Sequence, residues 1–140
     1  MHENILLIGD DPAEADTIRT ALANSRHVSF RVSWVRCCSE AIERLAAEDK
    51  LPGTHQARGI AAILLDLYLR DCHGIETFNR LFRAAPRTPI LVLAAAQDEH
   101  VAKAAVQHGA QGYLLKSIFS GCLLPWALRN MVVRSSPTRF

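Results

Sequence analysis

Residues 61–74, AAILLDLYLRDCHG, decide the fold. An uninterrupted apolar run ends in a single carboxylate, Asp66, and Gly74 opens the next segment eight residues later. The absence of polar alternation is typical of a strand covered on both faces, as the strands of parallel sheets are. Because open parallel sheets keep their chemistry beyond the carboxyl ends of the strands, we expect Asp66 to lie at a functional site.

The chain has 140 residues, 49% of them hydrophobic and 21% charged, which suits one domain with its own core. We expect this domain over residues 1–134, with a tail over residues 135–140. The formal charge of +2 comes from interspersed signs, so no direct binding to nucleic acid or to a membrane is expected. The apolar run at residues 5–8 is too short for a signal peptide or a membrane span, which favours a cytoplasmic protein.

Cysteines and histidines show no spacing typical of a metal site. The four cysteines lack a C-x-x-C pair, and the six histidines lack an H-x-x-x-H pair. We interpret the cysteines as small, reduced, hydrophobic residues.

Apolar runs alternate with amphipathic segments along the chain. We expect strands at residues 5–8, 30–35, 60–65, 90–93 and 113–115. Helical spacing predicts helices at residues 12–24, 39–47, 74–84, 99–108 and 123–134. Asp11 is the expected N-cap of the first helix, with Pro12 in the first helical position, and Gly109 is the expected C-terminal cap of the fourth.

This alternation predicts an α/β fold of five βα units, a doubly wound, flavodoxin-like sandwich with helices on both faces of a parallel sheet. The expected strand order is 2-1-3-4-5. That order places Asp10, after the first strand, beside Asp66, after the third. Ala94 then ends the fourth strand and Lys116 follows the fifth.

Several reaction classes lack their motifs. The sequence contains no G-x-G-x-x-G after the first strand, no G-x-x-x-x-G-K-[ST] and no G-x-S-x-G, so neither a nucleotide cradle nor a nucleophilic serine is supported. Crowded carboxylates repel each other unless a cation joins them, and Mg²⁺ accepts two carboxylates and a backbone carbonyl as ligands. With a lysine opposite, such a site suits phosphoryl transfer to a carboxylate.

Four motifs carry a resemblance to a known family. They are ILLIGDDP at 5–12, DLYLRDCHG at 66–74, PILVLAA at 89–95 and GAQGYLLK at 109–116. On these residues the chain resembles a CheY-like receiver domain of a two-component response regulator, from residue 5 to about residue 134. The resemblance implies a phosphorelay, in which a histidine kinase or histidine phosphotransfer protein donates a phosphoryl group and a conformational change reaches a downstream output domain or protein. It implies no catalysis beyond Mg²⁺-dependent self-phosphorylation and dephosphorylation.

The resemblance also implies roles for single residues. Asp66 falls on the phosphoacceptor, Lys116 on the lysine that binds the phosphoryl group, and Tyr113 on the aromatic switch residue. Ala94 falls on the position that couples to that switch.

The implied cofactor is Mg²⁺. Its ligands would be Asp10, Asp66 and the backbone carbonyl of Tyr68. Asp11 is a further candidate ligand, although its place before Pro12 favours an N-cap.

Three positions depart from the family pattern. Gly9 replaces the first acid of the usual pair, Ala94 replaces a Thr or Ser that bonds a phosphoryl oxygen, and Arg70 stands where many relatives have proline. A hydrogen bond to a charged group contributes about 1.5–3 kcal/mol, so the change at position 94 is expected to weaken the coupling about ten- to a hundredfold. We expect Asp66 to remain modifiable, with weaker Mg²⁺ binding and weaker switching.

Other functions remain open. One is a pseudo-receiver that binds proteins without phosphorylation, and another is the N-terminal input module of a larger cyclic-dinucleotide enzyme or hybrid kinase. A phosphatase of the haloacid-dehalogenase type is disfavoured, because it needs a second Asp where Tyr68 stands. The chain is expected to be too short for a DNA-binding output domain. Relatives often pair through a face that would here include Lys103, Gln107 and Arg129, so a homodimer is a further possibility.

Overall fold

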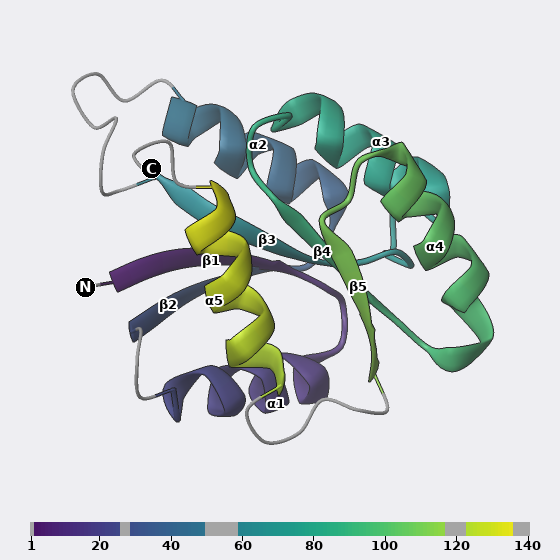
Figure 1. Cartoon of the computed structure of the whole chain (residues 1–140). Helices are drawn as coiled ribbons and strands as arrows, with labels where there is room; N and C mark the ends of the chain where they lie inside the picture. Colours follow the sequence, from purple (N-terminus) through teal and green to yellow (C-terminus); the bar gives the residue numbers. More distant parts are fainter. Residues whose placement is uncertain (1, 26–28, 50–58, 117–122, 136–140) are drawn as a thin grey trace.

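The computed structural model describes residues 2–25, 29–49, 59–116 and 123–135. Strands and helices alternate along these residues (Figure 1). In chain order they are β1 (His2–Ile8), α1 (Pro12–Ala23), β2 (Ser29–Val35), α2 (Cys38–Asp49), β3 (Ile60–Asp66), α3 (Ile75–Ala84), β4 (Ile90–Ala94), the 3-10 turn η1 (Ala96–Asp98), α4 (Glu99–His108), β5 (Gly112–Leu115) and α5 (Leu123–Ser135).

The strands form one parallel sheet in the order β2-β1-β3-β4-β5, which confirms the predicted topology. β1 and β3 are neighbours, with Ile8 opposite Leu65, so the residues after β1 meet the end of β3. Asp66 is the last residue of β3 and pairs with Leu93 of β4. The carboxyl edge of the sheet therefore carries Asp66 at its centre.

Helices cover both faces of the sheet, and each face has its own hydrophobic core. Figure 1 shows α1 and α5 on one side and α2, α3 and α4 on the other. Alternate residues of β3 supply the two cores: Ile63 and Leu65 pack on the α2–α4 side, and Ala62 and Leu64 on the α1–α5 side. This two-sided burial explains why the sequence of β3 shows no polar alternation.

Every predicted helix end lies within one residue of the observed end, except the C-terminus of α2. Asp11 caps α1 as predicted, its Oδ1 accepting from the Ala13 N–H at 2.9 Å. Gly109 ends α4 with φ of 129°, as expected of a C-terminal glycine. Gly74, predicted as the start of a helix, instead precedes α3 with φ of 70°, a conformation that glycine adopts without strain.

Among the helices, α2 differs most from its predicted range, and β1 begins three residues earlier than predicted, at His2. α2 begins one residue earlier than expected, at Cys38, and continues two residues further, to Asp49. Its N-terminus is capped from outside, because Asp71 accepts from the Cys38 N–H at 2.8 Å and the Ser39 N–H at 3.0 Å. A cap supplied from 33 residues away leaves no local signal in the sequence. The turn η1 was also not predicted, and residues 50–58, between α2 and β3, lie outside the described residues.

No helix among the described residues is both long enough and apolar enough to cross a membrane.

Candidate functional site

Asp66 is a buried acid with two fixed partners. Only 8% of the residue is exposed. Its Oδ1 accepts from the Tyr68 N–H at 3.0 Å, and its Oδ2 accepts from the Lys116 ammonium at 2.9 Å. A buried carboxylate needs such compensation, because an unpaired charge would be costly to desolvate. The contacts confirm the predicted proximity of Asp66 and Lys116 and fix the orientation of the carboxylate.

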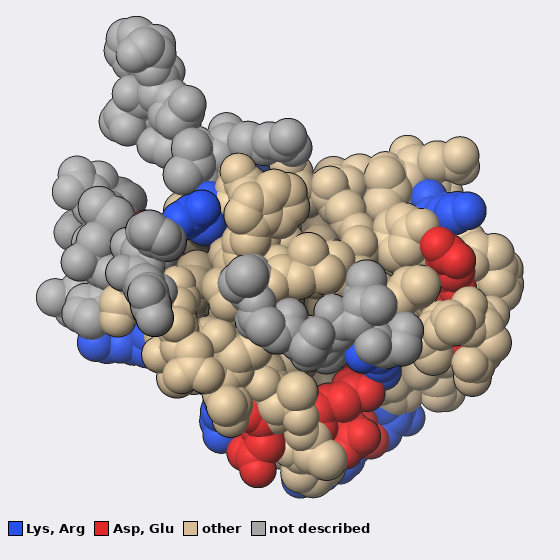
Figure 2. Space-filling view, turned by 60° about the horizontal axis from the view of Figure 1, so that its bottom comes forward, with Lys and Arg blue, Asp and Glu red and all other residues tan. Residues whose placement is uncertain are grey.

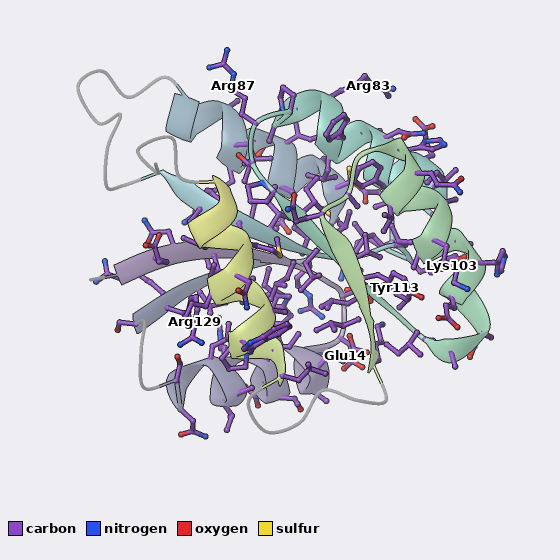
Figure 3. All side chains as sticks on the ribbon, viewed as in Figure 1. Glu14, Arg83, Arg87, Lys103, Tyr113 and Arg129 are labelled. Atoms are coloured by element: carbon purple, nitrogen blue, oxygen red, sulfur yellow. The ribbon has the colours of Figure 1, made fainter. Side chains whose placement is uncertain are left out.

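Lys116 has a second partner that sequence reasoning missed. Its Nζ lies 3.0 Å from Glu14 Oε2 as well as 2.9 Å from Asp66 Oδ2. Burial alone would lower the pKa of Lys116, but the hydrogen bonds and charges of Asp66 and Glu14 outweigh it and raise that pKa. Figure 3 shows Glu14, from the first turn of α1, close to the end of β5. Its only sequence signal is its place one turn into the helix that follows β1.

Asp10 is paired with two arginines. Its Oδ1 lies 2.8 Å from Arg70 Nη2 and 3.5 Å from Arg36 Nε. Arg36 also donates to the Asp10 backbone carbonyl at 3.3 Å. The hydrogen bond from Arg70 is the largest cause of a lowered pKa for the Asp10 carboxyl. Asp10 and Asp66 thus each have cationic partners within the chain.

Gly9 approaches Asp66 closely. A Cβ at position 9 would lie 3.7 Å from the Asp66 Cβ, an ordinary contact, so a Cβ is tolerated there. A hollow of about 10 Å³ lies beside the acid, lined by residues including Gly9, Glu14, Trp34 and Asp66. That is room for about one water molecule. The Gly9 carbonyl accepts from the Trp34 indole N–H at 2.7 Å, which ties β2 to this edge.

The predicted Mg²⁺ ligands are the carboxylates of Asp10 and Asp66 and the backbone carbonyl of Tyr68, with Asp11 as a further candidate. Within the described ranges, no three His, Cys, Asp or Glu side chains gather closely enough to hold a metal ion. The Asp11 carboxylate caps α1, and Asp10 contacts Arg70. Because exposed ion pairs contribute little to stability, Asp10 can exchange Arg70 for a metal ion at modest cost. The residues therefore fit Mg²⁺ only with competition at Asp10.

Ala94 and Tyr113 lie at the predicted switch positions. Ala94 ends β4, is 4% exposed and carries no hydroxyl. Tyr113 is half-buried between β5 and α4 (Figure 3), and its phenol donates to Glu99 Oε2 at 2.6 Å. This hydrogen bond is the largest cause of the raised pKa of Tyr113. The contact of Tyr113 with Glu99, at the start of α4, was not predicted. It gives Tyr113 a polar partner, whereas position 94 carries no hydroxyl.

The loop between β3 and α3 is held at several points. Besides the cap on α2, Asp71 accepts from the Ser39 hydroxyl at 3.2 Å. The Thr77 hydroxyl donates to the Leu67 carbonyl at 2.9 Å, and the Gly74 N–H donates to the same carbonyl at 2.8 Å. These bonds fix the backbone on both sides of Tyr68 and Arg70.

Charge at the molecular surface is mixed. On the face shown in Figure 2, acidic side chains lie directly beside basic ones. At the site, the negative charges of Asp10, Glu14 and Asp66 are likewise balanced by ion pairs with Arg70 and Lys116.

Comparison with known proteins gives matches over most of the chain. A family model described as the response regulator receiver domain matches residues 5–124. The glycerol metabolism activator of Pseudomonas putida is 34% identical over 79 residues, covering 56% of this chain and 36% of that protein. The transcriptional regulatory protein DcuR of Escherichia coli K12 is 26% identical over 134 residues, covering 93% of this chain and 52% of DcuR. The chain thus spans about half the length of DcuR and less of the activator.

A solved structure shows the same fold. The structure of a putative response regulator from Chloroflexus aurantiacus superimposes with a TM-score of 0.76 at 23% identity, covering 96% of this chain and all of that one.

Proposed function

Because the chain belongs to the response regulator receiver domain family, we propose that Asp66 accepts a phosphoryl group from a histidine kinase or a histidine phosphotransfer protein. One observation carries the proposal: Asp66 is buried at the end of β3 and lies 2.9 Å from a lysine ammonium. Phosphoryl transfer depends mainly on positioning and on charge neutralisation, and this pair supplies both.

In the transfer, the Tyr68 N–H holds Oδ1 of Asp66, and Oδ2 is the attacking oxygen. An O–P bond forms at Oδ2 as the N–P bond of the phosphohistidine breaks, and the imidazole takes back the electron pair. Lys116, already beside Oδ2, remains close enough to bind a phosphoryl oxygen as a point charge. Glu14 keeps the lysine charged and directed at the acid.

Mg²⁺ is the proposed cofactor, with Asp10, Asp66 and the Tyr68 backbone carbonyl as ligands. When bound, it would neutralise the phosphoryl oxygens. Weaker binding than in relatives with an intact acid pair is supported by Gly9, which offers no carboxylate, and by the contact between Asp10 and Arg70.

Signal output is proposed to be weaker than the family pattern implies. Ala94 cannot bond a phosphoryl oxygen, and Tyr113 is already engaged by Glu99. We propose that the signal passes to a downstream output domain or protein, since DcuR and the glycerol activator are both longer than this chain. A homodimer through Lys103, Gln107 and Arg129 is a further proposal; Figure 3 shows Lys103 on α4 and Arg129 on α5.

The test is modification by a small phosphodonor. The chain is incubated with acetyl phosphate and MgCl₂, and intact-mass spectrometry is used to detect the addition of one phosphoryl group. Wild type and Glu76→Gln, an exposed α3 acid paired with Arg83, are expected to be modified, and Asp66→Asn is not. Unmodified wild type, together with no change in the Tyr113 ring signals on adding beryllofluoride, would refute the proposal.

A second candidate function is phosphorylation-independent binding to a protein. It is favoured by the ion pair at Asp10 and the hydrogen bond at Tyr113, which engage the proposed metal-binding and switch residues without any ligand. In that case Asp66→Asn would bind the partner as tightly as wild type, whereas the leading proposal expects Asp66→Asn to abolish any donor-dependent change in partner binding.

A further inference from the structure

Arg70 places a positive charge directly on the proposed metal ligand Asp10. The 2.8 Å contact between Nη2 and Oδ1 is short enough for a charge-assisted hydrogen bond. Both partners are accessible, with 56% of the Arg70 side chain and 37% of the Asp10 side chain exposed. The guanidinium can therefore leave the carboxylate without unfolding any part of the chain.

We propose that Arg70 is a built-in counter-cation that competes with Mg²⁺ for Asp10 and so determines the metal affinity of the site. The inference rests on the proposed function, because it needs Asp10 to be a metal ligand. It goes beyond that function by assigning the metal requirement to a residue that is not itself a ligand.

Hydrogen bonds hold the backbone on both sides of Arg70. The next residue, Asp71, is bonded to the N-terminus of α2, and the preceding residue, Leu69, is buried and donates its N–H to the Cys72 carbonyl. With the chain fixed on both sides, the Arg70 side chain starts close to Asp10 and loses less freedom on pairing.

Arg36 is a weaker competitor for the same carboxylate. Its Nε lies 3.5 Å from Asp10 Oδ1. Its guanidinium also packs over the Trp34 ring, with Cζ 5.1 Å from the ring centroid. Its other contact is to the Asp10 backbone carbonyl. The carboxylate is therefore paired mainly with Arg70, and the larger effect of Arg70 on the lowered pKa of Asp10 supports this order.

The charge count at this edge explains the direction of the effect. A single carboxylate, Asp10, meets two guanidinium groups, so an arriving divalent cation finds its ligand already neutralised. Gly9 removes the second carboxylate that would favour the metal. Removing Arg70 leaves the Asp10 carboxylate free to bind the metal, and it also removes a positive charge that repels Mg²⁺.

The experiment is a Mg²⁺ titration followed by the ¹H–¹⁵N NMR shifts of the Gly9 and Tyr68 amides, at constant ionic strength. We expect Arg70→Ala to bind Mg²⁺ about two- to fivefold more tightly than wild type, where fivefold is the upper end for one exposed ion pair. Arg70→Lys keeps the charge without the planar fork, so it is expected to fall between the two. Arg83→Ala, which removes an exposed arginine elsewhere, is the matched control and is expected to equal wild type.

Salt provides an independent signature. Raising KCl from 50 to 500 mM screens exposed charges, so the advantage of Arg70→Ala over wild type is expected to shrink. Equal affinities in Arg70→Ala, Arg83→Ala and wild type would overturn the inference while leaving the metal site intact. If neither wild type nor Arg70→Ala shows a Mg²⁺-dependent shift that Asp10→Asn abolishes, both the inference and the proposed metal site fail.

Discussion

Replacing Asp71 with alanine tests whether the loop after β3 is held by the N-terminus of α2. The carboxylate accepts three hydrogen bonds, from the Cys38 N–H, the Ser39 N–H and the Ser39 hydroxyl, at 2.8, 3.0 and 3.2 Å. Loss of an N-cap costs about 0.5–2 kcal/mol. Because this cap serves two backbone donors and carries a charge at a helix N-terminus, we expect Asp71→Ala to lower the free energy of unfolding by about 2 kcal/mol.

Urea unfolding followed by circular dichroism measures this loss. The midpoint is expected to fall with little change in the m-value, since the native fold buries the same surface. For a chain of this size, about 2 kcal/mol corresponds to a melting temperature lower by about 6–10 °C. Asp71→Asn keeps an acceptor oxygen without the charge and is expected to lose roughly half as much.

The pH dependence gives a second measure of the same contact. Burial acts to raise the pKa of Asp71, but the Cys38 and Ser39 donors outweigh it and lower that pKa from 3.8. The stabilisation is therefore complete above pH 3.8 and is lost as the pH falls through the lower, folded-state pKa. The gap between wild type and Asp71→Ala should close over that range.

The control is Glu76→Ala, which removes an exposed acid from α3 and is expected to change the stability by less than about 0.5 kcal/mol. If Asp71→Ala is as stable as this control at neutral pH, the Asp71 cap does not hold the loop and the account of the fixed backbone around Arg70 is wrong.

Three further predictions concern the site. Lys116→Gln is expected to fold but to be modified by acetyl phosphate at least about tenfold more slowly, because Asp66 loses its cation; stopped time courses by mass spectrometry measure this. Tyr113→Phe is expected to lower the midpoint of urea unfolding, because the phenol loses its hydrogen bond to Glu99, and an unchanged midpoint would contradict this. The bond to Glu99 raises the pKa of Tyr113 from 10.0, so its contribution is complete below pH 10.0 and is lost as the pH rises through the folded-state pKa. Gly9→Asp is expected to bind Mg²⁺ more tightly in the same NMR titration, because a Cβ is tolerated at that position and aspartate adds a carboxylate; unchanged affinity would show that position 9 does not reach the metal.

The arrangement of the strands could be predicted from sequence because burial on both faces leaves a pattern within each segment. β3 reads as a continuous apolar run since its side chains alternate between two cores, and Asp66 marks its end. The same reasoning predicted that Asp66 and Lys116 lie at one edge of the sheet, because the carboxyl ends of parallel strands share an edge. Local helix caps such as Asp11 could be predicted equally well, because the capping residue is adjacent to its helix in the sequence.

Pairings between distant side chains could not be predicted in this way. Asp71 meets Cys38 across 33 residues, and Arg70 meets Asp10 across 60. Such contacts depend on side-chain directions that only the assembled fold defines, and no spacing rule relates the partners. The sequence indicated that Arg70 and Gly9 depart from the family pattern, but not that Arg70 contacts the acid left at position 10.

The departures at positions 9 and 70 act on the same carboxylate. Two adjacent acids at the end of β1, close to Asp66, would repel one another and favour a divalent cation. Gly9 removes one negative charge and Arg70 adds one positive charge, so a single guanidinium is enough to neutralise Asp10. Residues that share a partner rarely act additively. We therefore expect the combined Gly9→Asp and Arg70→Ala substitutions to change the Mg²⁺ affinity by a factor that differs from the product of the two single effects.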